Sequence, residues 1–226
     1  MRILLVAATA PEVAPVAAAL ALPQGPHAEA RTVDWRGHTV AGLITGVGMV
    51  ATAVWCTRAL AAGEYDLAMN LGVCGAFDPA LAPGTAVHVV ADGLAELGAE
   101  DGDQFLTLQQ MQLLGDNAFP YRDGWLRNDT PPVNPALDAL PQVRGITVNT
   151  VHGADASIAA VRRRFDPQVE TMEGAAFMYA CLVAGVPFAQ VRAVSNLVER
   201  RNRAAWKLPE AVAALGRTTL GILEAL

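Results

Sequence analysis

The sequence has few charged residues and no concentration of positive charge, and both shortages exclude a class of function. Charged residues make up 17% of the 226 residues, and the formal net charge is -6. The 16 lysines and arginines are scattered apart from two short clusters. Nucleic-acid binding requires a basic face. We therefore expect no nucleic-acid partner.

Cysteine is also scarce, and its spacing excludes a disulfide framework. The three cysteines, Cys56, Cys74 and Cys181, lie in apolar surroundings with no CxxC spacing. An odd number of such thiols indicates a reducing compartment and gives no zinc signature. We expect neither a metal ion nor another cofactor.

Long hydrophobic runs are missing as well. No run approaches the roughly 20 apolar residues of a membrane-spanning helix. The apolar segment 1–8 is about one strand long, and Glu12 interrupts any longer hydrophobic region, so no export signal is evident. The expectation is a cytoplasmic protein with no membrane partner.

Apolar residues are what the chain does contain, at 53% of the sequence. A small monomer has limited interior in which to bury so many apolar side chains, so this excess favours a homodimer or a larger homo-oligomer. The length fits one α/β domain and is short for two.

Strand and helix patterns alternate along the chain. Buried strands are expected at 2–8, 67–71, 85–91, 145–151, 169–172 and 186–194, a hairpin at 31–44 with its turn at 35–38, and helices at 12–22, 50–62, 157–165, 173–184 and 209–226. This alternation predicts a single α/β domain, 1–226, with a mostly parallel or mixed, twisted central sheet flanked by helices. The segment 92–142 loses the pattern, and we interpret it as an irregular insertion or lid with a short helix at 106–114.

Chemically distinctive residues follow four of the expected strands, at the edge where such folds bind ligands. Glu12 follows the first strand, a glycine turn at 72–75 follows a middle strand, Glu173 follows another, and Arg192 and Asn196 end the last. Glu12 alone is compatible with a first-turn glutamate, and Asn196 with a cap or turn residue.

Two of these residues are harder to explain as structural. Glu173 stands among Met, Gly and Ala, where a carboxylate needs a reason to be present. Arg192 lies in an apolar strand and must find a polar partner. Cys74 is interpreted as a small buried hydrophobe and His152 as a structural hydrogen-bonding residue.

Together, the turn at 72–75, the pair Met172-Glu173 and the run 192–196 (Arg-Ala-Val-Ser-Asn) resemble the nucleoside phosphorylase and nucleosidase superfamily. The similarity is greatest to its methylthioadenosine/S-adenosylhomocysteine nucleosidase branch. It spans the chain except for 92–142.

The resemblance implies a role for each matching residue. Glu12 would activate the attacking water, Glu173 would bind the ribose hydroxyls beside Met172, Arg192 would help to hold the water, and Asn196 would contact N7 of the purine. The resemblance also places further substrate contacts at Val73, Cys74, Gly75 and Ile158. The partner is then a small-molecule nucleoside.

Two departures from the superfamily pattern narrow the reaction. Related phosphorylases have Arg and Ser where this chain has Asn70 and Val73, so the groups that pair with phosphate are missing and water is the expected nucleophile. Adenine-releasing nucleosidases have Asp at the position of Asn196. An amide donates and accepts, so it can serve N7 and O6 of a 6-oxopurine together.

A water-using enzyme with this base preference resembles the futalosine hydrolases, which release hypoxanthine from futalosine in a route to menaquinone. The residues 197–203 and Trp206 also resemble that family. The alternatives are a methylthioadenosine/S-adenosylhomocysteine or aminodeoxyfutalosine nucleosidase, a 6-oxopurine nucleoside phosphorylase, and a non-catalytic nucleoside-binding protein.

The resemblance to futalosine hydrolases implies a second subsite, because the ribose of futalosine also carries an aromatic carboxylate chain. An apolar groove and a cation would bind that chain. The groove candidates are Phe77, Phe105, Trp125 and Trp206, and the candidate cations are Arg200, Arg201 and Arg203.

Overall fold

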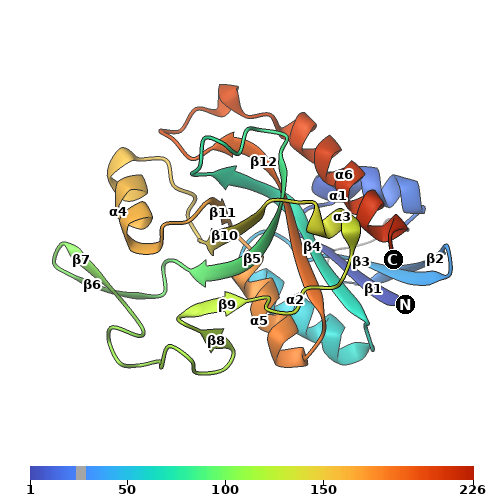
Figure 1. The fold of residues 1–226 in the computed structure, drawn as a ribbon, viewed down its shortest axis with the longest axis horizontal. Helices are drawn as coiled ribbons and strands as arrows, with labels where there is room; N and C mark the ends of the chain where they lie inside the picture. Colours follow the sequence, from blue (N-terminus) through green and yellow to red (C-terminus); the bar gives the residue numbers. More distant parts are fainter. Residues whose placement is uncertain (24–28) are drawn as a thin grey trace.

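The computed structural model describes residues 1–23 and 29–226 as an alternation of strands and helices (Figure 1). The strands are β1 (Arg2–Ala7), β2 (Arg31–Trp35), β3 (His38–Ile44), β4 (Leu67–Ala76), β5 (Ala86–Leu94), β6 (Gly98–Asp101), β7 (Gln104–Thr107), β8 (Tyr121–Arg122), β9 (Trp125–Arg127), β10 (Gln142–Thr147), β11 (Val169–Thr171) and β12 (Phe188–Leu197). The helices are α1 (Ala10–Leu20), α2 (Met49–Ala62), α3 (Pro135–Asp138), α4 (Asp155–Phe165), α5 (Gly174–Ala184) and α6 (Leu208–Glu224).

The central sheet is covered on both faces, as the continuous apolar runs of its strands predict. In β1 successive side chains enter opposite layers. Ile3 and Leu5 pack in the cluster that contains residues of α1 and α6. Leu4 and Val6 pack in the cluster that contains residues of α2 and α5. Helix α1 packs on α6 and α2 packs on α5, so two helix pairs enclose the sheet (Figure 1).

Five strands pair with one another in a closed ring. The ring includes β4, β11 and β12, which carry or precede Gly72, Glu173 and Asn196. β4 pairs with β11, β11 with β10, β10 with β5, β5 with β12, and β12 with β4 again. The pairings β4–β11 and β5–β12 are antiparallel and the other three are parallel. The predicted α/β class with a mixed central sheet is confirmed.

The expected turn after residue 71 is wrong, because β4 continues to Ala76. Gly72 and Gly75 are strand residues beside which other side chains come close. A Cβ at Gly72 would overlap Arg192 Nη1, and one at Gly75 would lie 2.9 Å from Val198 Cγ2. Glycine in a strand can mark such a close approach, just as glycine elsewhere can mark a turn.

The segment 92–142 contains more regular structure than its sequence predicts. β5 extends to Leu94, β6 and β7 form a separate hairpin, and β8 and β9 add to the main sheet. The expected helix at 106–114 is wrong, since β7 ends at Thr107 and turns follow. The strands here are short, so their alternation is weak in the sequence. A role as a lid stays a prediction.

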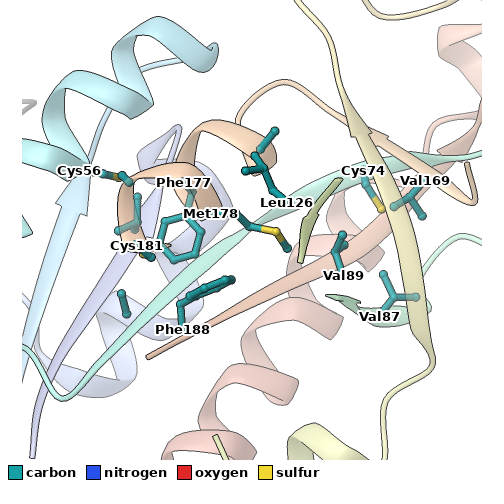
Figure 2. Close-up of a cluster of buried hydrophobic side chains, with 14 of the residues drawn as sticks. Cys56, Cys74, Val87, Val89, Leu126, Val169, Phe177, Met178, Cys181 and Phe188 are labelled. Carbon is teal, nitrogen blue, oxygen red and sulfur yellow. The ribbon is translucent and has the colours of Figure 1, made fainter. Parts of the chain in front are cut away.

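The three cysteines lie in the core. Cys56 and Cys181 occupy the layer between α2, α5 and the sheet, and Cys74 lies near Val169 (Figure 2). Burial raises the pKa of Cys74 to about 12, so its thiol stays protonated and is not a nucleophile. The part of the chain that the structure describes holds no helix with the length and apolarity needed to cross a membrane.

Candidate active site

Glu12 links the start of α1 to strand β4. Its Oε2 accepts hydrogen bonds from Thr9 N at 3.0 Å and Thr9 Oγ1 at 2.7 Å, as in a capping box. Its Oε1 accepts from Val73 N at 3.0 Å. The side chain is half-buried. Oε2 therefore acts as expected of a structural glutamate in the first turn of a helix. Oε1 points to the sheet and can accept a further hydrogen bond.

Gly72 is the point where Glu12 and Arg192 meet. Arg192 is opposite Gly72 in the parallel pairing of β12 with β4. A Cβ at Gly72 would overlap Arg192 Nη1 and lie 2.9 Å from Glu12 Oε1. Because Gly72 has no side chain, the guanidinium of Arg192 and the carboxylate of Glu12 can both lie directly beside this residue of β4.

Arg192 is 1% exposed and has polar partners on two sides. Its Nη2 donates to Asn70 Oδ1, and its Nη1 lies 3.8 Å from Glu173 Oε2. Asn70 is itself buried and also bonds to the carbonyl of Val6 at 3.3 Å. Arg192, which the sequence places in an apolar strand, therefore has the polar partners that were expected. Its guanidinium lies toward Glu173.

Glu173 is held at the start of α5 and is 6% exposed. Besides Arg192, it accepts a hydrogen bond from Gly48 N at 3.0 Å through Oε1. Gly48 has φ 98°, a conformation that favours glycine and directs this N–H toward the carboxylate. The segment that precedes α2 thus contributes the N–H of Gly48 to the site.

A buried polar network supports the beginning of α5. Asp92 accepts from Gln190 Nε2 and from Thr147 Oγ1, each at 2.9 Å. Thr147 Oγ1 also accepts from Ala175 N at 2.7 Å. Burial raises the pKa of Asp92 to about 6, against the hydrogen bonds from Gln190 and Thr147 and the charge of Arg192. This network fixes the backbone that follows Glu173.

Asn196 reaches its position through a bulge. β12 pairs Val194 with Cys74 and then Asn196 with Gly75, so Ser195 is the extra residue. Ser195 Oγ donates to Asn196 Oδ1 at 2.7 Å, and Asn196 Nδ2 donates to the carbonyl of Leu197 at 2.9 Å. From Arg192 to Asn196 the strand rises by roughly 10–13 Å. Asn196 therefore lies beyond the charged group, along the same strand.

Asn196 lines a small cavity in which the sequence assigned Gly75, Arg201 and Trp206 to substrate binding but gave no site role to the other members. Those other members include Val151, His152 and Glu170. His152 Nδ1 lies 2.5 Å from Glu170 Oε2, and Glu170 Oε1 accepts from His152 N at 2.9 Å. The prediction that His152 is a hydrogen-bonding residue is confirmed, but its place beside Asn196 was missed. The available signal was its position just after a strand end.

The residues predicted to contact substrate lie on several different elements of the fold. Val73 contributes its N–H to Glu12, and the carbonyl of Cys74 accepts from Ser195 Oγ at 3.1 Å. Met172 is half-buried next to Glu173. Ile158 lies on α4 and packs against a cluster that contains Phe77. Its contact with substrate stays a prediction.

The predicted aromatic groove is not one continuous surface. Trp206 and Arg201 line the cavity of Asn196, and Phe77 packs edge-on against His152 at 6.3 Å between ring centroids. Phe105 and Trp125 line a different pocket, beside Arg164. The residues described group no three His, Cys, Asp or Glu side chains in a way that could hold a metal ion.

These contacts assemble two neighbouring groups of side chains. The first is charged and contains Glu12, Arg192 and Glu173. The second contains Asn196, Glu170 and His152 and is rich in hydrogen-bonding groups. A carboxylate beside a guanidinium can hold and deprotonate water, and a second carboxylate can stabilise positive charge on a sugar.

Known proteins with similar sequences point to one family. Residues 2–224 match the family model described as the Phosphorylase superfamily. The chain is 31% identical over 199 residues to the futalosine hydrolase of Thermus thermophilus, covering 84% of each chain. It is 36% identical over 177 residues to that of Acidothermus cellulolyticus, covering 76% of this chain and 70% of the relative.

Solved structures with the same fold include a methylthioadenosine/S-adenosylhomocysteine nucleosidase from Colwellia psychrerythraea in complex with adenine. It has a TM-score of 0.82 and 21% identity, and the match covers 100% of this chain and 96% of that one. The futalosine hydrolase of Helicobacter pylori has a TM-score of 0.81 and 14% identity, covering 100% and 98%. These structures confirm the fold. By its sequence, this chain belongs to the phosphorylase superfamily and, within it, to the futalosine hydrolase family.

Proposed function

We propose that this protein hydrolyses the N-glycosidic bond of futalosine, releasing hypoxanthine and dehypoxanthine futalosine on a route to menaquinone. The observation that carries the proposal is the meeting of Glu12 and Arg192 at Gly72, with Glu173 Oε2 3.8 Å from Arg192 Nη1. The relatives named futalosine hydrolase support the choice of substrate.

In the proposed reaction Glu12 is the general base. Water donates a hydrogen bond to Glu12 and attacks the anomeric carbon as the bond to the base breaks. The sugar then carries oxocarbenium-like positive charge, as in glycoside hydrolysis. Glu173 binds the ribose hydroxyls and stabilises that charge, while Arg192 orients Glu173 and helps to hold the water beside Glu12. The departing purine receives a hydrogen bond from Asn196 at N7 and leaves as hypoxanthine on taking up a proton, which balances the proton that water gives to Glu12.

Water is favoured over phosphate by the partners of Asn70 and Val73. Asn70 Oδ1 accepts from Arg192, and Val73 N donates to Glu12. Neither residue presents a cation or a hydroxyl to an anion, and a phosphate dianion is stabilised mainly by such charge-assisted contacts. Arg192 is the nearby cation and already has two partners.

A substrate panel tests this function. We expect free hypoxanthine from futalosine at the same rate with and without phosphate, and slower release of base from inosine, methylthioadenosine and aminodeoxyfutalosine. Chromatographic detection of free base measures all four. Release that requires phosphate would identify a phosphorylase, and faster cleavage of 6-aminopurine nucleosides would identify an adenine-releasing nucleosidase.

Replacing Asn196 by aspartate should shift the preference toward 6-aminopurines. An ionised carboxylate only accepts hydrogen bonds, so it pairs with a 6-amino group and repels O6. We expect the ratio of kcat/KM for futalosine to that for aminodeoxyfutalosine to fall by about 10-fold or more. Asn202→Asp, at an exposed position that lines the same cavity, is the matched control. A variant that still cleaves only 6-oxopurines would refute this account of base selection.

We also propose that the protein is a cytoplasmic homodimer or larger homo-oligomer. Helices α2 and α5 expose Val50 (73%), Val54 (55%) and Val183 (57%). Beside these residues lies an apolar groove lined by Met49, Ala53, Ala176 and Tyr179, among others. Contiguous apolar surface of this kind is typical of protein interfaces. Light scattering coupled to size exclusion measures the mass, and a monomer at micromolar concentration would refute the proposal.

A further inference from the structure

Glu170 and Asn196 flank Gly75 on neighbouring strands. Glu170 of β11 is opposite Gly75 in the antiparallel pairing with β4, and Asn196 of β12 is opposite the same glycine on the other side. Paired residues direct their side chains to the same face of a sheet. The Cα atoms of Glu170 and Asn196 are therefore about two strand spacings, roughly 10 Å, apart. Gly75 puts no side chain between them.

Glu170 is buried, and its contacts within the cavity are to His152. It is 4% exposed, accepts from His152 N at 2.9 Å through Oε1, and contacts His152 Nδ1 at 2.5 Å through Oε2. An ionised carboxylate only accepts hydrogen bonds, so the proton of this contact belongs to Nδ1. In the neutral tautomer that this contact selects, the lone pair is on Nε2.

The imidazole is held in place from several sides. Phe77 packs against it edge-on. The loop that carries His152 is tied to the loop after β12, since Arg201 N donates to the carbonyl of Gly153 at 3.3 Å. Both His152 and Asn196 line the same cavity. A ring so fixed, beside the residue that is expected to contact N7, is suited to recognise a second edge of the same base.

We propose that His152, positioned by Glu170, accepts the N1–H of a 6-oxopurine through Nε2 and so selects hypoxanthine over adenine. This inference rests on the proposed function, because it concerns the base of the same substrate. In hypoxanthine N1 is a donor, whereas in adenine N1 is an acceptor. A neutral Nε2 pairs with the first and opposes the second. Asn196 recognises N7 and O6, and His152 recognises N1.

Binding of free hypoxanthine and adenine, measured by calorimetry, tests the pair without turnover. The ratio of the Kd for adenine to that for hypoxanthine should exceed about 10 in the unmodified protein, since a site built to bond one donor rejects the analogue that lacks it. 1-Methylhypoxanthine, which has no N1–H, should bind at least about 10-fold more weakly than hypoxanthine. Equal binding of hypoxanthine and adenine, or of hypoxanthine and its methyl derivative, would overturn the proposal with no variant needed.

Two substitutions separate recognition from positioning. In Glu170→Gln the amide donates to Nδ1, which moves the ring proton to Nε2, so adenine should gain affinity while hypoxanthine loses it. In His152→Phe the ring shape stays but both nitrogens are lost, so hypoxanthine should lose affinity with no gain for adenine. We expect the ratio to fall by about 10-fold or more in each variant.

Glu210→Gln is the matched control, an exposed glutamate in the first turn of α6 that does not line the cavity. Its ratio should match that of the unmodified protein. An unchanged ratio in Glu170→Gln or His152→Phe, or a change in Glu210→Gln of the same size, would overturn the proposal. Failure of the unmodified protein to release hypoxanthine from futalosine would instead refute the proposed function, which the binding ratios do not measure.

Discussion

Glu12→Gln should lower kcat by about 100- to 10,000-fold, the usual contribution of a general base. The single amide oxygen can still accept from Thr9 N, as glutamine does in a capping box, so α1 keeps its start, while the amide NH2 replaces the oxygen that accepts from Val73 N. The amide, however, cannot take a proton from water. Steady-state kinetics with futalosine measure the loss, and KM should change little, because the base acts on the water and not on the nucleoside.

A suitable control for this substitution is Glu210→Gln. Glu210 lies in the first turn of α6, as Glu12 lies in the first turn of α1, but it is exposed and is no part of the site. Its variant should keep full activity. Unchanged turnover in Glu12→Gln would remove the residue from its role as base, and a large rise in KM with unchanged kcat would assign it to binding.

The charged half of the site could be predicted because its residues conflict with their local sequence. Glu173 and Arg192 lie in apolar segments, where an ionised side chain is retained only with a partner. Each also follows or ends a strand of a largely parallel sheet, so the fold class alone places them near one edge. The structure pairs them at 3.8 Å, in agreement with that expectation.

The second group of the site, which contains Asn196, Glu170 and His152, depends on strand pairing, and no local sequence pattern reveals that pairing. Glu170 stands in a short strand that the sequence shows only as buried, and its importance comes from lying opposite Gly75. That pairing is antiparallel, in a sheet expected to be mostly parallel. Gly48 reaches Glu173 from 125 positions away along the chain. The glycines of β4 were misinterpreted for the same reason, since the side chains that exclude a Cβ there come from distant segments.

Arg192→Met should have the largest effect on stability. Removing one member of a buried ion pair leaves the other charge uncompensated, at a cost of about 3–5 kcal/mol in the free energy of unfolding. For a chain of this length that corresponds to a fall in Tm of roughly 6–20 °C. Arg217→Met, at an exposed position of α6, should leave Tm unchanged. Scanning calorimetry measures both.

A second substitution distinguishes loss of charge balance from loss of packing. Glu173→Gln removes the uncompensated charge while its amide oxygen can still accept from Gly48 N. If the cost of Arg192→Met is electrostatic, the double variant should recover at least half of the lost Tm, because a neutral pair in a buried site costs less than a lone ion. Turnover should not recover with it, since Glu173 is needed to stabilise the charged sugar. Recovery of stability without activity would show that the ion pair is retained for the reaction, and a Tm no higher than that of Arg192→Met alone would show that the arginine acts through its packing.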